Sequence, residues 1–245
     1  MVDDNLSISQ CGLSSVQKNA VINSFIDTQR LTLSKEKSVV IHVGKISKCK
    51  NTCPTLKVHN HDRKTVQSHR YLGDIIAATG SLRETIEDRR NKGWGKVAEI
   101  SRILSELPTL RKMEVGLKLR EAKIVNGMIY STEAWSSISN ADLTRLEQVD
   151  MAGLRSLVQG HSKCSTAFII LEFGVLQLRH RIVARRMMLH HHNLTRGDHE
   201  LIKKVDLKQK EDSIRGDWFQ TLQNNFSFIG EEIYDQKVLN MSKYQ

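Results

Sequence analysis

The sequence predicts an α+β protein that is mostly α, with a small mixed part followed by a longer run of helices. Short β-branched runs lie in the first 80 residues, helix-forming residues dominate after them, and only Pro54 and Pro108 interrupt the chain. The predicted division is a mixed part over residues 1–80, a helical part over residues 81–160 and a helical extension over residues 161–245.

Composition and charge narrow the classes of function. The 245 residues are 39% hydrophobic and 26% charged, and no apolar run approaches the length of a membrane-spanning helix. The chain has four cysteines and no secretory signal, which favours an intracellular location. Its net charge is +10, with basic residues spread over the whole length. Because such a surface attracts polyanions, we expect a nucleic-acid partner and no membrane partner.

In the first 80 residues we expect short strands around one helix. The helix begins at Ser14 or Ser15, and its apolar residues Val21, Ile22, Phe25 and Ile26 share one face. The expected strands are a pair flanking an acidic turn in residues 1–9 and single strands at residues 39–43, 56–58 and 71–76.

Apolar residues at helical spacing predict the rest of the chain to be helical. Gly93 and Gly95 predict a kink or break in the first helix, and Ser139 with Asp142 predicts a capped start of the third. Trp94 and Trp135 could stack on nucleic-acid bases, but they occupy apolar helical positions that are more typical of a core. The expected helices span residues 81–107, 113–135, from 139, 176–191 (with Arg179, Arg181, Arg185 and Arg186 toward solvent) and from 218, and residues 197–217 form a solvated helix or linker.

Two adjacent carboxylates, Asp3 and Asp4, stand at the predicted first turn. Neighbouring negative charges repel each other, and a divalent cation removes that conflict. Polymerases hold two Mg²⁺ ions on carboxylates in such turns. Taken alone, the pair is weak evidence for such a site, because acidic pairs at a chain start are common and a solvated turn is the more usual explanation.

The residues that follow this pair resemble the carboxy-terminal part of a reverse transcriptase from LINE-type (non-LTR) retrotransposons. Met1-Val2-Asp3-Asp4 is similar to the start of the catalytic hairpin, although the family usually has an aromatic residue where Met1 stands. The similar segments are residues 1–12 (motif C), 19–37 (motif D), 70–76 (motif E, the primer grip), 86–104 (the first thumb helix), 131–135, 146–155, 171–174 and 217–218. The order and spacing of these segments carry the resemblance.

This resemblance implies a palm remnant over residues 1–80, a helical thumb over 81–160 and a carboxy-terminal extension over 161–245. It implies an RNA template, a DNA primer and a nuclear or cytoplasmic location. Asp3 and Asp4 would be catalytic and would bind Mg²⁺, and Lys37 would lie near the phosphates of the incoming nucleotide. Tyr71, Leu72 and Gly73 would support the primer end, and Arg89, Lys92 and Lys96 would face phosphates of the RNA–DNA hybrid.

Ordinary structural roles stay open for these residues. Lys37 is also consistent with an exposed loop lysine, residues 71–73 with a core strand, and the three basic residues of the first thumb helix with a solvated face. Spacing disfavours zinc at Cys49 and Cys53, with His59 and His61 nearby, or at His190–His192.

The sequence contains no segment that matches the family's fingers or its other metal-binding aspartate strand. We therefore expect no polymerisation by this chain alone. Three functional hypotheses follow: the carboxy-terminal part of an RNA-directed DNA polymerase, a non-catalytic basic helical module that binds nucleic acid, or an unselected truncated copy of an element.

Overall fold

A computed structural model describes most of the chain. The described residues are 6–9, 12–31, 34, 37–43, 57–58, 61–136, 138–158, 164–212 and 217–228. They form a mostly helical α+β protein with a few short strands. The chain divides into two compact units, residues 1–85 and residues 86–245. The three-part division expected from the sequence stays a prediction.

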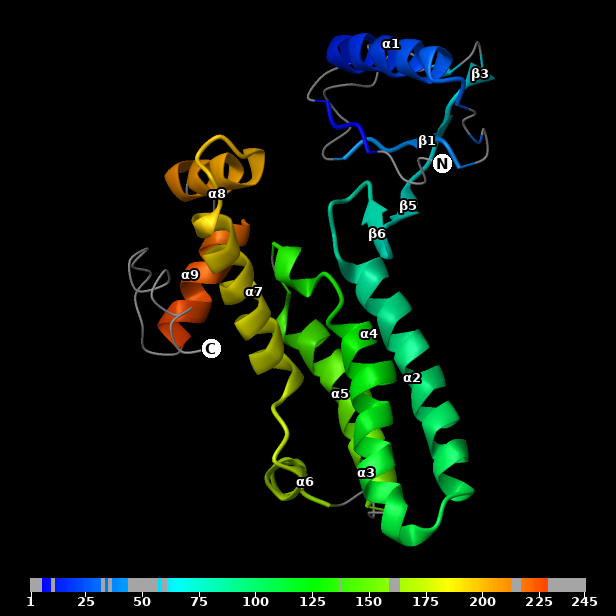
Figure 1. Cartoon of the computed structure of the whole chain (residues 1–245), viewed down its shortest axis with the longest axis vertical. Helices are drawn as coiled ribbons and strands as arrows, with labels where there is room; N and C mark the ends of the chain where they lie inside the picture. Colours follow the sequence, from blue (N-terminus) through cyan, green and yellow to red (C-terminus); the bar gives the residue numbers. More distant parts are fainter. Residues whose placement is uncertain are drawn as a thin grey trace. The chain divides into compact units, whose positions relative to one another are not determined.

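The described residues of the first unit form the helix α1, which Figure 1 shows, and three two-stranded sheets. β1 pairs with β4 in parallel, and the other two sheets are antiparallel. Ile26 of α1 is buried, whereas Val21 and Phe25 are exposed, so the expected apolar face of this helix is only partly covered. The elements are α1 (Gly12–Thr28), β1 (Val39–Val40), β2 (Lys57–Val58), β3 (His61–Asp62), β4 (Lys64–Thr65), β5 (Ser68–Tyr71) and β6 (Asp74–Ala77).

The single strand expected over residues 71–76 is instead a hairpin. β5 and β6 pair through Tyr71 and Asp74, and the two residues between them form the turn. Leu72 has φ 47° and Gly73 has φ 90°, the positive values that a tight two-residue hairpin turn needs at both positions. Glycine adopts such a φ without strain, which explains why the chain reverses here.

The second unit is built from helices (Figure 1). The long helix α2 begins just before it, and the last of the described helices ends at Phe228. None of the helices that the structure describes is both long and apolar enough to cross a membrane. The elements are α2 (Arg83–Ser105), α3 (Thr109–Leu119), the π-helix η2 (Arg120–Val125), α4 (Asn126–Met128), the 3₁₀ helix η3 (Thr132–Ala134), α5 (Asn140–Leu157), α6 (Thr166–Phe173), α7 (Leu178–Thr195), α8 (Leu201–Asp212) and α9 (Trp218–Phe228).

Helix α2 is continuous, so the break expected at Gly93 and Gly95 is absent from it. Gly93 is instead the point where α2 and α5 approach closely: a Cβ atom there would lie 2.8 Å from Cγ1 of Val149. Gly116 and Gly153 are crowded in the same way by side chains of neighbouring helices, whereas Gly95 has nothing within 4 Å of its Cβ position. The helices therefore pack closely at glycines.

This packing predicts opposite effects for two substitutions one half-turn apart. Gly93→Ala should lower the free energy of unfolding by about 1–3 kcal/mol, because Val149 is β-branched and cannot easily move away. Gly95→Ala should raise it by up to about 1 kcal/mol, since alanine favours a helix and meets no neighbour. Urea unfolding followed by circular dichroism measures both changes. Equal effects would contradict a close approach at Gly93.

The second expected helix, over residues 113–135, is shorter and less regular than predicted. It consists of α3, the π-helical segment η2 and α4, and ends at Met128. A turn with Ser131 at φ 52° then leads into η3, and Trp135 is buried. The capped start of α5 is confirmed: the Ser139 hydroxyl accepts a hydrogen bond from the Asp142 main-chain N–H at 3.1 Å.

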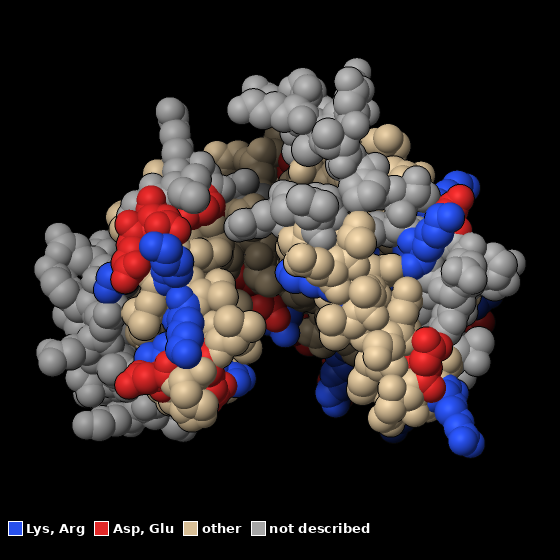
Figure 2. Space-filling model, turned by 90° about the horizontal axis from the view of Figure 1, so that it is seen from above, with Lys and Arg blue, Asp and Glu red and all other residues tan. Residues whose placement is uncertain are grey.

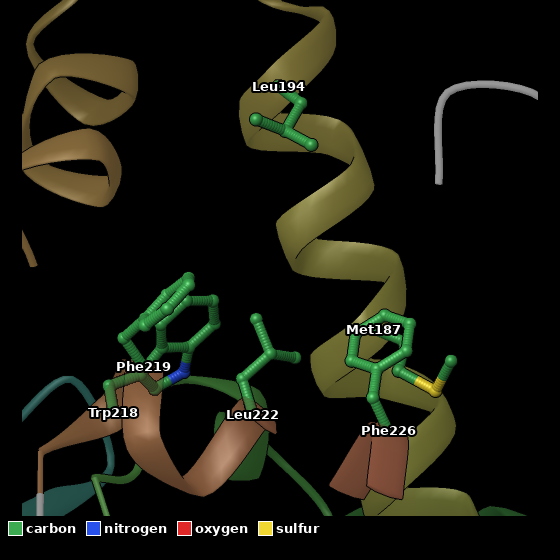
Figure 3. Packing of buried hydrophobic residues seen from close by; sticks show 6 residues of the cluster. All are labelled: Met187, Leu194, Trp218, Phe219, Leu222 and Phe226. Carbon is green, nitrogen blue, oxygen red and sulfur yellow. The ribbon is translucent and has the colours of Figure 1, made fainter. Parts of the chain in front are cut away.

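The last amphipathic segment is confirmed as a helix packed on α7. Its apolar residues join two residues of α7, and Figure 3 shows the side chains of Phe226 and Met187 next to each other. The stripe of α9 thus covers one side of α7, as expected from the helical spacing of its aromatic residues. The cluster contains Met187, Leu194, Trp218, Phe219, Leu222 and Phe226.

Candidate nucleic-acid interface

Of the three predicted catalytic residues, the structure describes only Lys37. Asp3 and Asp4 lie outside the described residues, and Leu6–Ser9, the described part of the predicted hairpin, is not in a strand. Lys37 is exposed in a turn, where its main-chain N–H donates to the Ser34 hydroxyl at 3.4 Å. Among the residues that are described, no group of three or more His, Cys, Asp or Glu side chains is placed to hold a metal ion. The Mg²⁺ site at Asp3 and Asp4 stays a prediction.

The three predicted primer-grip residues lie together at the tip of the β5–β6 hairpin. Leu72 is 55% exposed and Gly73 is exposed, while Tyr71 is half-buried. The base of the hairpin is tied to α2, because the Thr85 hydroxyl accepts from the Ile75 N–H at 2.9 Å and lies 3.1 Å from its carbonyl oxygen. The base of this β-hairpin is thus held against the first turn of α2.

Lys92 and Lys96 are exposed on α2, but each has a carboxylate partner. Lys92 Nζ lies 2.8 Å from Asp88 Oδ2, and Lys96 Nζ lies 2.7 Å from Glu99 Oε2. Lys123 also contacts Glu99, at 2.5 Å. Hydrogen bonds from Lys123 and Lys96 lower the pKa of Glu99 to about 2, so this carboxylate is ionised at neutral pH. This face of α2 therefore carries alternating charges, and a phosphate would have to exchange with a carboxylate to bind it.

Arg89 does not lie on the exposed basic face that the sequence predicted for it. Its side chain is 5% exposed, its Nη1 donates to the Met128 carbonyl at 3.0 Å, and its guanidinium lies 4.5 Å from the ring centre of Trp135. The guanidinium provides a partner for a carbonyl at the end of α4, where no intrahelical donor is available. In this structure the Arg89 guanidinium is bound by protein groups instead of lying on an exposed face, and its contact with phosphates stays a prediction.

The arginines of α7 all contact protein groups, and the expectation that they face solvent is wrong for the buried Arg186, while Arg179 and Arg185 are partly exposed. Arg179 makes a bidentate pair with Glu147 at 2.8 and 2.6 Å, and Arg181 pairs with Glu121. Arg185 donates to the Ile129 carbonyl at 2.8 Å. Arg186 is buried and donates to the Trp135 carbonyl at 3.2 Å, and desolvation lowers its pKa to about 10.

Arg89, Arg185 and Arg186, together with two residues of α9, bind the segment that follows α4. Five side chains from α2, α7 and α9 donate to main-chain carbonyls of residues 128–136, a stretch that includes the segment 131–135 on which part of the resemblance rests. These side-chain donors hold a connection whose own backbone hydrogen bonds are limited to short turns. The donor–acceptor pairs are Arg89–Met128, Arg185–Ile129, Trp218–Glu133, Arg186–Trp135 and Thr221–Ser136.

Three basic residues that the sequence did not single out lie where α2 meets α3. Arg102 and Arg111 are exposed and Lys112 is half-buried, and no carboxylate of the described residues forms an ion pair with any of them. Figure 1 shows α2 and α3 as neighbours joined by a short turn, and the Cβ position of Gly116 lies 3.4 Å from Leu104. Helices α2 and α3 form a helical hairpin, which is distinct from the β5–β6 hairpin. We call Arg102, Arg111 and Lys112, which lie at the tip of this helical hairpin, the hairpin-tip cations.

The start of α3 adds to the positive potential of these cations. Its N-cap residue is Pro108, which makes no side-chain capping hydrogen bond, and its first turn contains no acidic residue. Free N–H groups and the helix dipole make such an end favourable for an anion. Elsewhere, on the face drawn in Figure 2, acidic and basic side chains lie beside one another and form no single basic patch.

The comparisons with protein-family models, curated proteins and solved structures found no match.

Proposed function

We propose that this chain is the carboxy-terminal part of a LINE-type reverse transcriptase, with a palm remnant followed by a helical thumb that binds the backbone of an RNA–DNA hybrid. The order of the motif-like segments along the sequence carries the proposal. A hairpin with an exposed tip at Leu72 and Gly73, followed directly by the long helix α2, is consistent with a primer grip leading into a thumb.

The hairpin-tip cations are the residues best placed to bind phosphate. A cation that is already paired must give up a carboxylate to bind a phosphate, whereas Arg102, Arg111 and Lys112 have no such partner among the described residues. Two of them stand on the first turn of α3, where the helix end itself favours an anion. Lys92 and Lys96 contribute more weakly, because Asp88 and Glu99 compete for them.

This proposal predicts a change in the salt dependence of binding. Replacing Arg102, Arg111 and Lys112 together by glutamine should reduce the slope of log K against log salt by about 3, because roughly one counterion is released per phosphate contact. Fluorescence anisotropy with a labelled RNA–DNA hybrid over a salt series measures the slope. The Lys92→Gln, Lys96→Gln variant should change it less.

A variant with the same loss of charge is the control for this measurement. Lys204→Gln, Lys208→Gln and Lys210→Gln remove three charges from the exposed helix α8. A slope that falls equally in both triple variants would mean that only net charge matters, and the hairpin-tip interface would be rejected.

Catalysis is tested separately from binding. If the native transcript encodes an aspartate-bearing strand in frame before Met1, the longer product should extend a DNA primer on an RNA template, and Asp3→Ala should abolish that extension. Binding by the present chain should be indifferent to Asp3→Ala, because metal ligation at Asp3 does not hold the hybrid. Binding without any primer extension by the longer product would favour the alternative, a non-catalytic nucleic-acid-binding module.

A further inference from the structure

Helix α8 has an unusual distribution of buried side chains. The only buried residue among its twelve is a carboxylate, Asp206. Its apolar residues point the other way: Leu201 is 75% exposed, and Ile202 and Val205 are also exposed. A surface helix normally buries its apolar residues and keeps its charges in water, so α8 is not held by a hydrophobic stripe.

The Asp206 carboxylate contacts two buried polar residues of α7. Its Oδ1 accepts a hydrogen bond from Asn193 Nδ2 at 3.2 Å, whereas its Oδ2 lies 3.1 Å from His190 Nδ1 without a hydrogen bond between them. His190 and Asn193 stand about one turn apart, so one carboxylate reaches both. The ring centroids of Trp218 and Phe219 lie 6.1 and 6.2 Å from that of His190. These two aromatic rings shield the contact between α7 and α8.

Each of the other ionic contacts described for α8 includes an exposed carboxylate. Lys203 pairs with Asp198 at 2.7 Å and donates to the Arg196 carbonyl at 3.1 Å, and Asp198 is exposed. Lys208 pairs only with residues of its own helix. Exposed pairs of this kind add little to stability, whereas a hydrogen bond to a buried charge adds more.

We propose that α8 is a latch: a helix that opens and closes on α7 as a separate unit, with Asp206 as the group that holds it closed. A helix of twelve residues is marginal in water without tertiary packing, so its closed state depends on this buried contact. Helices α7 and α9 stay together when α8 opens, because they share the apolar cluster of Figure 3. This inference does not rest on the proposed function.

Hydrogen–deuterium exchange of the whole chain, read by mass spectrometry, tests the latch. In the wild type, amides of residues 201–212 should be protected but exchange faster than those of α5, because α8 opens without global unfolding. Asp206→Ala should speed exchange in α8 by roughly ten- to hundredfold, the effect of losing a hydrogen-bonded buried charge. Exchange in α5 should not change, which also shows that the variant is folded.

Asp198→Asn is the matched control, because it removes an exposed carboxylate that also contacts the α8 region. It should leave exchange in α8 within about threefold of the wild type. Three results would overturn the proposal: α8 and α5 exchanging at the same rate in the wild type, Asp206→Ala accelerating both equally, or Asp198→Asn acting as strongly as Asp206→Ala.

Discussion

Replacing Asp150 with alanine should lower the free energy of unfolding by about 3–5 kcal/mol. Asp150 and Arg120 are 3% and 1% exposed, and they form two hydrogen bonds of 2.7 Å each. Without the carboxylate, the Arg120 guanidinium would remain inside the helical unit without its main partner. A buried charge that has lost its partner costs far more than the pair itself contributes.

The π-helical segment η2 gives this pair its position. Arg120 opens the segment and reaches Asp150 on α5, while Glu121 pairs with Arg181 on α7 and Lys123 contacts Glu99 on α2. Three residues of one segment thus contact three different helices. Segments of π-helix are rare and often mark sites under a special constraint, and here the constraint is this set of contacts.

Two further variants separate charge burial from loss of contacts. Glu147→Ala removes another carboxylate of α5 that binds an arginine in bidentate fashion, but the Arg179 side chain is partly exposed, so the cost should be about 1 kcal/mol or less. The double variant Arg120→Met, Asp150→Leu should recover most of the loss, since an apolar pair needs no compensation. Urea unfolding of the wild type, of these variants and of the single variants Arg120→Met and Asp150→Leu gives these values. A double variant as unstable as the sum of its two single substitutions would contradict this explanation.

The features predicted correctly from the sequence depend on neighbouring residues. Ser139 and Asp142 are three residues apart, so the start of α5 could be recognised from the cap alone. The helical spacing of Trp218, Leu222 and Phe226 was sufficient to predict α9 as an amphipathic helix. Where local geometry and the burial of an apolar stripe determine the structure, the residue pattern is sufficient to predict it.

The features predicted wrongly depend on residues far along the chain. Gly93 resembles a helix breaker, but its role is set by Val149, which lies 56 positions later. Arg89 sits at the edge of an apolar face, and only the position of the Met128 carbonyl shows that it points inward. The turn at Leu72 and Gly73 was locally visible, since glycine in the second turn position is typical of a tight hairpin, but the surrounding apolar residues favoured a strand.

The candidate interface shows the same limit. The exposed lysines of α2 could be predicted from spacing, whereas their pairing with Asp88 and Glu99 changes what they can bind. The hairpin-tip cations could have been found from one signal, basic residues on both sides of Pro108 without an acidic residue in the first turn of α3. Sequence periodicity assigns a residue to a face, but it does not show whether the charge on that face is already neutralised.

The two tryptophans at predicted core positions should respond very differently to substitution. Trp135→Ala should lower the free energy of unfolding by about 3–5 kcal/mol, because the side chain is 4% exposed and its ring also contacts the Arg89 guanidinium at 4.5 Å. Trp94→Ala should cost less than about 1 kcal/mol, since Trp94 is 40% exposed. Both lie in the same unit, so one urea titration per variant, followed by circular dichroism, compares them directly.

The physical reason lies in what surrounds each ring. Trp135 lies near the end of the segment 128–136, several of whose carbonyls are bound by arginines. Its removal would leave a cavity beneath Arg89 and weaken the contact of α2 with that segment. Trp94 lies beside Gly93, the residue that faces α5, so its own side chain points away from that contact. If Trp94→Ala proved as costly as Trp135→Ala, the exposed face of α2 would have to be covered in solution, and the lysines on that helix would not be free to meet a nucleic acid.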